Sequence, residues 1–168
     1  MKHAVIYSSV SGNTRSVGEA ILEILPPGSA IFPVQNAPDP EEFDFLALGF
    51  WVHRVMPDPR MRRYMQRVRG KRVAWFGTLS AWPDSDSANR VRQSANELLE
   101  TENTLLGGYL CQGRLEAKRF AAVMDPVNPR SRHIMTEERR ARLLEAAKHP
   151  NAEDFTKARE VFRKFLGL

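Results

Sequence analysis

Cysteine is nearly absent from this chain of 168 residues, in which only Cys111 occurs. A single cysteine cannot form an internal disulfide and supplies no cysteine-based metal site. The four histidines show no ligand spacing, so no metal site is expected. We interpret Cys111 as a small core residue within a predicted strand, and cytoplasmic residence as the default for such a chain.

Long apolar runs are also missing. The longest one, residues 45–52, is far too short to span a bilayer. The short apolar run near the N-terminus leads into a serine-rich turn, which is typical of a strand and not of a signal peptide. With 42% hydrophobic and 27% charged residues, the chain has the composition of one soluble globular domain.

Acidic residues are scarcer than basic ones, and the formal net charge is +5. Eight positive charges lie between Arg54 and Arg72, where the only acidic residue is Asp58. This cluster is either a solvated helix face or a surface that attracts an acidic protein partner. No aromatic-interleaved or zinc-finger pattern accompanies it, so we expect no nucleic-acid binding, and we expect no membrane association.

Apolar segments and amphipathic segments alternate along most of the chain. This order implies a parallel sheet that helices cover on both faces. Pro33 places the second predicted strand at the edge of the sheet, and Gly107 and Gly108 predict a bend or bulge in the fifth. The predicted strands are residues 3–7, 30–34, 44–50, 71–77 and 104–115.

The helices are predicted from their apolar stripes and end signals. The first follows the serine-rich turn and ends before residues 26–28, which read Pro-Pro-Gly. We expect a single domain with a core at about residues 1–115 and a helical extension at about residues 116–168. The other predicted helices are a peripheral one at residues 57–68, one from Ser85 or Asp86 to about residue 102, one at residues 117–124, one from Thr136 to about residue 148 and one from Asn151; residues 125–132 are predicted to be loop.

A hydroxyl-rich turn, S-S-V-S-G-N-T at residues 8–14, joins the first predicted strand to the first predicted helix. This geometry offers backbone N–H groups and the positive end of a helix dipole to an anion. The alternative is an ordinary capped turn. The turn has neither the Gly-Lys-Ser/Thr of a Walker loop nor the three glycines of a dinucleotide fingerprint. We interpret it as a different kind of phosphate-binding loop.

The S-x-S-G-N-T string resembles the loop with which flavodoxins hold the phosphate of flavin mononucleotide (FMN). The resemblance extends over residues 2–115 by the order of elements. It implies an α/β fold, the flavodoxin-like three-layer sandwich, with a five-stranded parallel sheet in the order 2-1-3-4-5. The stretches G-F-W-V at residues 49–52 and G-T-L-S-A-W-P-D-S at residues 77–85 are similar to a divergent bacterial subgroup. Some members of that subgroup accompany larger reductases, among them enzymes that reduce bilins.

Ligands of open parallel sheets bind at the carboxyl ends of the strands, a rule of which flavodoxin is itself an example. Three segments after the first, third and fourth predicted strands are therefore candidate FMN contacts. Trp51 and Trp82 could stack on the flat isoalloxazine ring, or either could be a core residue. No catalytic residue is assigned. The candidate cofactor-binding residues are Ser9, Ser11, Gly12, Asn13, Thr14, Phe50, Trp51, Val52, His53, Thr78, Leu79, Ser80 and Trp82.

The chain departs from typical flavodoxins in two ways. Typical members are strongly acidic, and their third loop has a Gly and an Asp where this chain has Leu79 and Ser80. The resemblance implies an FMN-binding electron carrier that passes electrons from a reductase to a terminal enzyme, with redox partners that could be acidic. One alternative is a small FMN-dependent NAD(P)H reductase of a quinone or another flat acceptor. Another is a flavin-free binding protein of the same fold.

Overall fold

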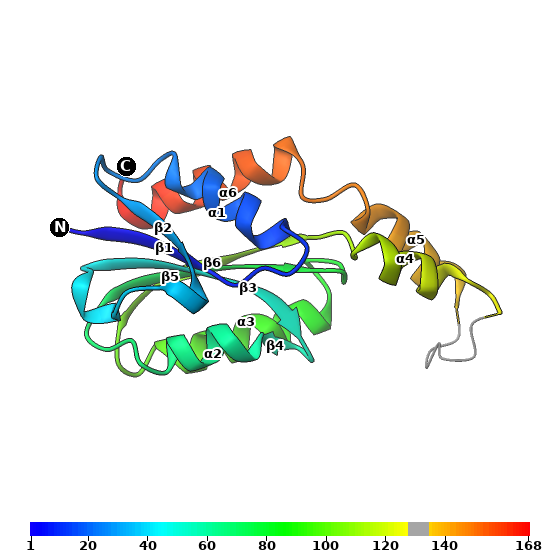
Figure 1. Ribbon diagram of the computed structural model, residues 1–168, viewed down its shortest axis with the longest axis horizontal. Helices are drawn as coiled ribbons and strands as arrows, with labels where there is room; N and C mark the ends of the chain where they lie inside the picture. Colours follow the sequence, from blue (N-terminus) through cyan, green and yellow to red (C-terminus); the bar gives the residue numbers. More distant parts are fainter. Residues whose placement is uncertain (128–134) are drawn as a thin grey trace.

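A central parallel sheet organises the molecule (Figure 1). We describe residues 1–127 and 135–168 of a computed structural model of the chain. The strand order is β2-β1-β3-β5-β6, and a short strand, β4, pairs antiparallel with β3. Counting the parallel strands alone, this is the predicted order 2-1-3-4-5, with β2 at the edge. The strands are β1 (His3–Tyr7), β2 (Ala30–Pro33), β3 (Phe45–His53), β4 (Met56–Pro57), β5 (Arg72–Leu79) and β6 (Thr104–Gln112).

Two pairs of helices enclose the sheet (Figure 1). α1 (Asn13–Leu22) and α6 (Ala152–Leu166) lie beside each other on one face. α2 (Pro59–Met65) and α3 (Asp86–Leu99) cover the other face. Two short 3-10 helices, Val34–Asn36 and Pro40–Glu42, lie between β2 and β3. The result is the three-layer arrangement that the alternation of elements predicted.

Strands β3 and β5 lie in the middle of the sheet, and most of their residues are buried because helices cover both faces. Successive side chains point to opposite faces, so one core contains Leu48 and Trp75 and the other contains Phe76 with Phe162 of α6. Gly108 is required beside Trp75, because a Cβ there would lie 2.0 Å from the indole. The predicted bulge is present, since the pairing of β5 with β6 shifts between Val73 and Ala74.

The segment that follows the third predicted strand belongs to a β-hairpin. β3 continues to His53 and turns back into β4, with Val52 opposite Pro57. Arg54 (φ 50°) and Val55 (φ 57°) form the two-residue turn in the left-handed region. Asn-Gly is the usual sequence for such a turn, and the Arg54-Val55 sequence does not predict one. β5 likewise extends two residues beyond its predicted end, to Leu79.

Helix α2 lies deeper than predicted. Met61, Tyr64, Met65 and the nearby Val68 are all buried in the core under the sheet. The stripe is narrow, but the side chains of Met61, Tyr64 and Met65 are long and belong to the same core as residues of β3. The prediction of a peripheral helix was therefore wrong.

The helices after residue 116 have two different placements. α4 (Ala117–Met124) has its predicted bounds, and α5 (Glu137–Ala146) and α6 begin after their predicted caps, Thr136 and Asn151. α6 completes a layer with α1, whereas α4 and α5 project together beyond the sheet (Figure 1). We call α4 and α5 the arm. Of the predicted loop at residues 125–132, only residues 125–127 lie within the described part of the chain.

Candidate functional site

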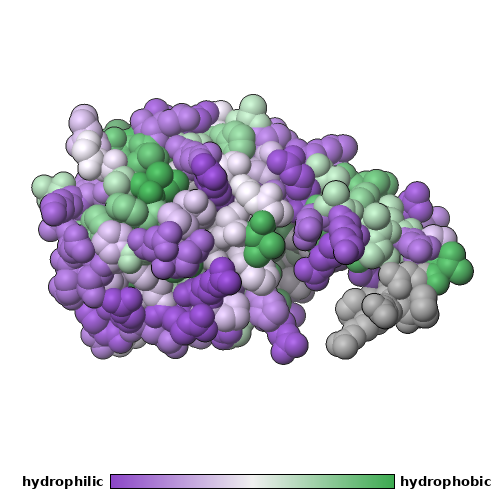
Figure 2. Space-filling model, in the orientation of Figure 1, coloured by the Kyte–Doolittle hydropathy of each residue, from purple (hydrophilic) through white to green (hydrophobic). Residues whose placement is uncertain are grey.

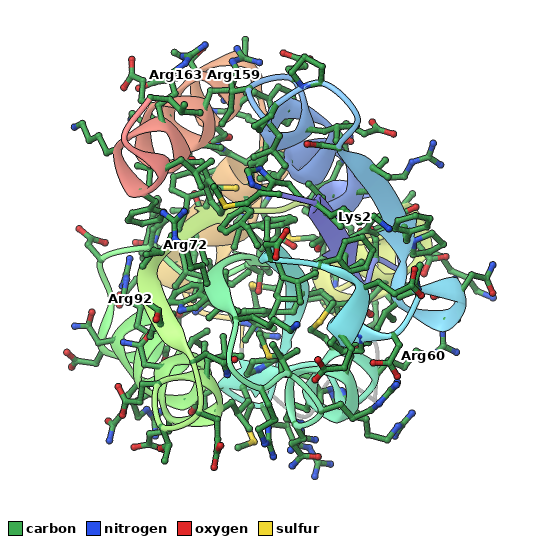
Figure 3. The ribbon with its side chains drawn as sticks, turned by 90° about the vertical axis from the view of Figure 1, so that its left-hand side faces the viewer. Lys2, Arg60, Arg72, Arg92, Arg159 and Arg163 are labelled. Carbon is green, nitrogen blue, oxygen red and sulfur yellow. The ribbon has the colours of Figure 1, made fainter. Side chains whose placement is uncertain are left out.

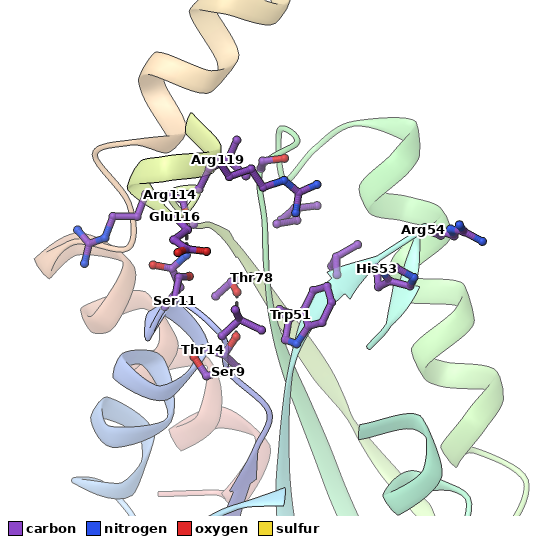
Figure 4. A pocket seen from close by; sticks show the side chains of 17 residues that line it. Ser9, Ser11, Thr14, Trp51, His53, Arg54, Thr78, Arg114, Glu116 and Arg119 are labelled. Atoms are coloured by element: carbon purple, nitrogen blue, oxygen red, sulfur yellow. Dashed lines mark hydrogen bonds between the residues drawn. The ribbon is translucent and has the colours of Figure 1, made fainter. Parts of the chain in front are cut away.

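The carboxyl ends of β1, β3, β5 and β6 surround a cavity of about 530 Å³, the main cavity (Figure 4). It lies where the chain order reverses, because β1 has β2 on one side and β3 on the other. Its volume is that of a small-molecule pocket. Ten predicted residues line it, namely Ser9, Ser11, Asn13, Thr14, Trp51, Val52, His53, Thr78, Leu79 and Ser80.

The turn at residues 8–14 leads directly into α1. Gly12 is the N-cap with a φ of 89°, a left-handed conformation that favours glycine. The Ser9 hydroxyl accepts a hydrogen bond from the Gly12 N–H at 3.1 Å, which closes the turn. The N–H groups of the first helical turn have no carbonyl partner within the helix, and the helix dipole is positive there. The turn therefore presents donors and a positive potential to the main cavity.

Two buried side chains connect this turn to β5 and to the segment after β6. The Thr14 and Thr78 hydroxyls form a hydrogen bond of 2.9 Å, which joins α1 to β5. The Asn13 amide donates to the Arg114 carbonyl at 2.7 Å, which joins α1 to the segment after β6. Gly113 permits that approach, because a Cβ there would lie 2.7 Å from the Asn13 amide nitrogen. The Asn13 Oδ1 atom is buried and has no hydrogen-bond partner among the described residues.

An aromatic side chain forms the wall opposite the turn (Figure 4). Trp51 is half-buried, and its ring meets His53 edge-on with centroids 5.5 Å apart. The Trp51 carbonyl accepts from the N–H of Asp58 at 3.0 Å. The Asp58 carboxylate in turn accepts from the Ser8 hydroxyl at 2.8 Å. Asp58 thus couples the ends of β1 and β3, so the two walls of the main cavity keep their spacing.

Three of the predicted cofactor-binding residues do not line the main cavity. Gly12 shapes the turn without facing the cavity. Phe50 is fully buried against Trp75. Successive side chains of a strand point to opposite faces, so Phe50 and its neighbour Trp51 cannot both line the cavity. Trp82 is 37% exposed and lines a separate cavity with Ser85 and Arg142.

The sequence reasoning missed the part of the lining that follows β6. Because the carboxyl-end rule applies to every parallel strand, it should have included Gly113 and Arg114. No local signal could have placed α4 there. The Arg119 side chain reaches from α4 toward the main cavity, whereas that of Arg54 points away from it (Figure 4). The lining residues after β6 that were missed are Gly113, Arg114, Leu115, Glu116 and Arg119. Val10 and Arg54 also line the cavity and lie within two of the predicted segments, although neither was among the candidate residues.

Residues 1–127 and 135–168 contain neither a metal-binding cluster nor a membrane-spanning helix. No group of three or more His, Cys, Asp or Glu side chains there could hold a metal ion. No helix in that part of the chain is long and apolar enough to cross a membrane. Cys111 is buried, as expected for a core residue, and burial raises the pKa of its thiol.

The chain is similar to two proteins described as flavodoxin-like domain-containing protein BilS. The one from Clostridioides difficile (strain CD3) is 25% identical over 164 residues, which cover 94% of this chain and 92% of the relative. The one from Clostridium symbiosum (strain WAL-14163) is 26% identical over an alignment of 192 positions, which covers 99% of this chain and 94% of the relative.

Two solved structures share the fold. A flavoprotein from Lactobacillus acidophilus NCFM in complex with FMN has a TM-score of 0.53 at 16% identity, over 65% of this chain and 92% of its own. A flavodoxin from Streptococcus pneumoniae TIGR4 has a TM-score of 0.53 at 12% identity, over 94% of this chain and 99% of its own. The family model described as "Flavodoxin domain" matches residues 4–163, which include the turn, the arm and most of α6. The chain therefore belongs to the flavodoxin domain family.

Proposed function

We propose that this chain binds FMN in the main cavity and carries electrons from a reductase to a terminal enzyme in the cytoplasm. The proposal depends chiefly on one observation: the hydroxyl-rich N-terminus of α1 and the Trp51 ring face the same cavity at the switch point of the sheet. Membership in the flavodoxin domain family supports it.

The residues present fit the phosphate of FMN. The amides at the start of α1 and the hydroxyls of Ser9 and Ser11 are donors suited to a phosphate. Thr14 holds the turn to β5 through its bond to Thr78. Arg119 adds a positive charge that faces the cavity, although Glu116, which also lines it, partly offsets that charge.

The residues also fit the rest of the FMN molecule. The buried Asn13 Oδ1 atom is an acceptor without a partner in the described residues, and the sugar-alcohol chain of FMN carries hydroxyl donors. Trp51 offers a ring face to the isoalloxazine. When bound, FMN supplies the redox chemistry, while the chain orients the ring, limits its contact with water and sets its electrostatic surroundings.

A second candidate is a small FMN-dependent NAD(P)H reductase of a quinone or another flat acceptor. It needs room beside the flavin. A cavity of about 520 Å³ next to the arm provides such room, because it shares Ser80, Leu115 and Arg119 with the main cavity. Steady-state oxidation of NAD(P)H by the purified protein with a quinone, without any added protein, would favour this candidate over the carrier.

The double variant Ser11→Ala/Thr14→Ala tests the FMN site. It removes two hydroxyls that line the main cavity, and Thr14 can donate to the phosphate while it accepts from Thr78. Each hydroxyl is worth about 1.5 kcal/mol toward a charged group, so FMN should bind about 100-fold more weakly. Riboflavin lacks the phosphate, and its affinity should fall by less than about fivefold. Titrations followed by flavin fluorescence measure both affinities.

The matched control is Ser16→Ala, since the Ser16 hydroxyl donates to the Gly12 carbonyl and does not line the main cavity. This variant should bind FMN like the parent. If the parent bound no FMN, the carrier and the reductase would both be rejected in favour of a flavin-free binding protein. If the double variant bound FMN like the parent, the phosphate would have to lie elsewhere.

A further inference from the structure

The arm lies outside both hydrophobic cores. Leu143 and Ala146 of α5 are buried, yet neither belongs to a core cluster of the sheet, and α4 has no buried residue. Leu144 of α5 is 45% exposed, and Val127, which lies three residues beyond the end of α4, is 81% exposed. Figure 2 shows hydrophobic surface gathered over this part of the molecule. A projecting helical pair with exposed apolar side chains is typical of an interaction surface.

The arm and the residues that flank it also carry an excess of positive charge. Residues 114–148 include nine Lys and Arg but five Asp and Glu, in a chain whose net charge is +5. Within the described residues, Lys118, Arg119 and Arg140 form no ion pair. The charges of Lys118 and Arg140 are therefore available to a partner, whereas Arg119 faces the main cavity.

The arginine-rich segment at residues 54–72 differs from the arm because three of its eight basic side chains form ion pairs. Arg67 pairs with Asp39 at 2.7 Å, Lys71 with Glu41 at 3.2 Å and Arg69 with Glu102 at 3.8 Å. Viewed from the end opposite the arm, Arg60 and Arg72 lie far apart around the rim among other separate basic side chains (Figure 3). Arg60, Arg63 and Arg67 line one cavity beside α2, but that cavity shares no residue with the main cavity.

The arm adjoins the main cavity. Glu116, immediately before α4, and Arg119 within α4 both line that cavity. A protein that binds the arm consequently lies beside the mouth of the cavity, where a redox group must come close to exchange electrons.

We infer that the arm is the docking surface for an acidic electron-transfer protein. The apolar side chains provide a contact area, and the unpaired cations select a partner of negative charge and speed its association. The electron-transfer part of this inference rests on the proposed function; the docking part rests on the shape and charge of the arm.

The test compares two double charge reversals. Lys118→Glu/Arg140→Glu changes the arm without touching the main cavity, and Arg60→Glu/Arg63→Glu makes the same change in charge on the exposed face of α2. The probe is a purified [2Fe–2S] ferredoxin of net negative charge, and surface plasmon resonance measures its binding to the flavin-free full-length protein at low and high salt. The arm variant should bind about tenfold more weakly at low salt and lose most of the salt dependence. The α2 variant should stay within about twofold of the parent.

A third variant, Leu144→Ser, separates the apolar contribution from the charge. It should weaken binding by a few-fold and leave the salt dependence unchanged. Equal weakening by the α2 and arm reversals, or no binding by the parent at low salt, would overturn the inference. So would tighter arm-dependent binding to phosphatidylserine vesicles than to the ferredoxin, because that outcome indicates a membrane surface as the occupant.

A separate FMN titration distinguishes this inference from the proposed function. Binding of FMN by the parent without any arm effect on ferredoxin would reject the docking surface alone. An arm effect in a protein that binds no FMN would reject the electron carrier and retain the docking surface.

Discussion

Trp51 and Trp82 have similar settings in the sequence, since each follows a predicted strand in the central part of the sheet. Their surroundings differ in the fold. Trp51 is held within β3 by pairing with neighbouring strands, and its ring lines the main cavity. Trp82 lies beyond the end of β5, next to the start of α3, and lines another cavity. A single residue type at an equivalent position therefore does not indicate an equivalent role.

Replacing each tryptophan with alanine tests this difference. Trp51→Ala should weaken riboflavin and FMN alike, by about 3- to 10-fold, because a stacked aromatic contributes about 0.5–1.5 kcal/mol beyond its buried area. Trp82→Ala serves as the control and should leave both affinities near those of the parent. The measurement is a flavin titration of the two variants and the parent. A larger loss in Trp82→Ala than in Trp51→Ala would contradict the placement of the ring site.

Helix α2 depends on one buried acidic residue. The Asp58 carboxylate accepts from the N–H groups of Arg60 and Met61 at the helix start, and from the Ser8 hydroxyl. It is fully buried, and its Oδ2 atom has no partner among the described residues. Asp58 is thus both an N-cap and a link between α2 and the end of β1.

Asp58→Ala should destabilise the flavin-free protein by about 2–3 kcal/mol, because it removes a helix cap and leaves the buried Ser8 hydroxyl without its acceptor. Asp39→Ala is a suitable control. Asp39 also caps a short helix and accepts from Glu41, but its side chain is exposed. Its loss should destabilise the protein clearly less than the loss of Asp58. Urea unfolding followed by circular dichroism measures both, and equal losses would show that Asp58 acts as a cap alone.

At the scale of the whole molecule, one histidine connects the arm to the body. His149 hydrogen-bonds Asp154 of α6 at 2.6 Å and Glu145 of α5 at 3.3 Å. Burial alone would lower its pKa, but the two carboxylates outweigh that effect, so the pKa of His149 is raised above its ordinary value. The bond from the Arg114 N–H to the His149 carbonyl adds a link to the segment after β6.

A raised folded-state pKa stabilises the folded protein when the histidine is protonated. This contribution is complete below the ordinary histidine pKa of about 6.5 and is lost as the pH rises through the raised pKa of His149. The free energy of unfolding of the parent should therefore exceed that of His149→Gln most at about pH 6 and by less at about pH 8. Burial lowers the pKa of His3, but that effect is common to both proteins and cancels in the difference. A difference that grows from pH 6 to pH 8 would contradict the assignment.

The sequence by itself determined those features that depend on near neighbours along the chain. Apolar runs and their alternation with amphipathic segments predicted the parallel strands and most of the helices. The order of the strands was implied only by the resemblance of the turn to the flavodoxin loop. The turn at residues 8–14 was recognisable because its donors lie within one strand–turn–helix unit. Thr136 and Asn151 were found as caps because a cap bonds to N–H groups two or three residues further on.

Tertiary structure alone decided what depends on contacts between distant residues. The hairpin at Arg54 and Val55 has no turn signal and forms through the pairing of β4 with β3. The Ser8–Asp58 bond joins residues 50 positions apart, and the Asn13–Arg114 bond joins residues 101 apart. α6 completes a layer because its apolar stripe packs on a face of the sheet. The arm projects beyond the sheet and covers neither face. Periodicity shows that a helix has an apolar face, but only the assembled fold determines what covers that face.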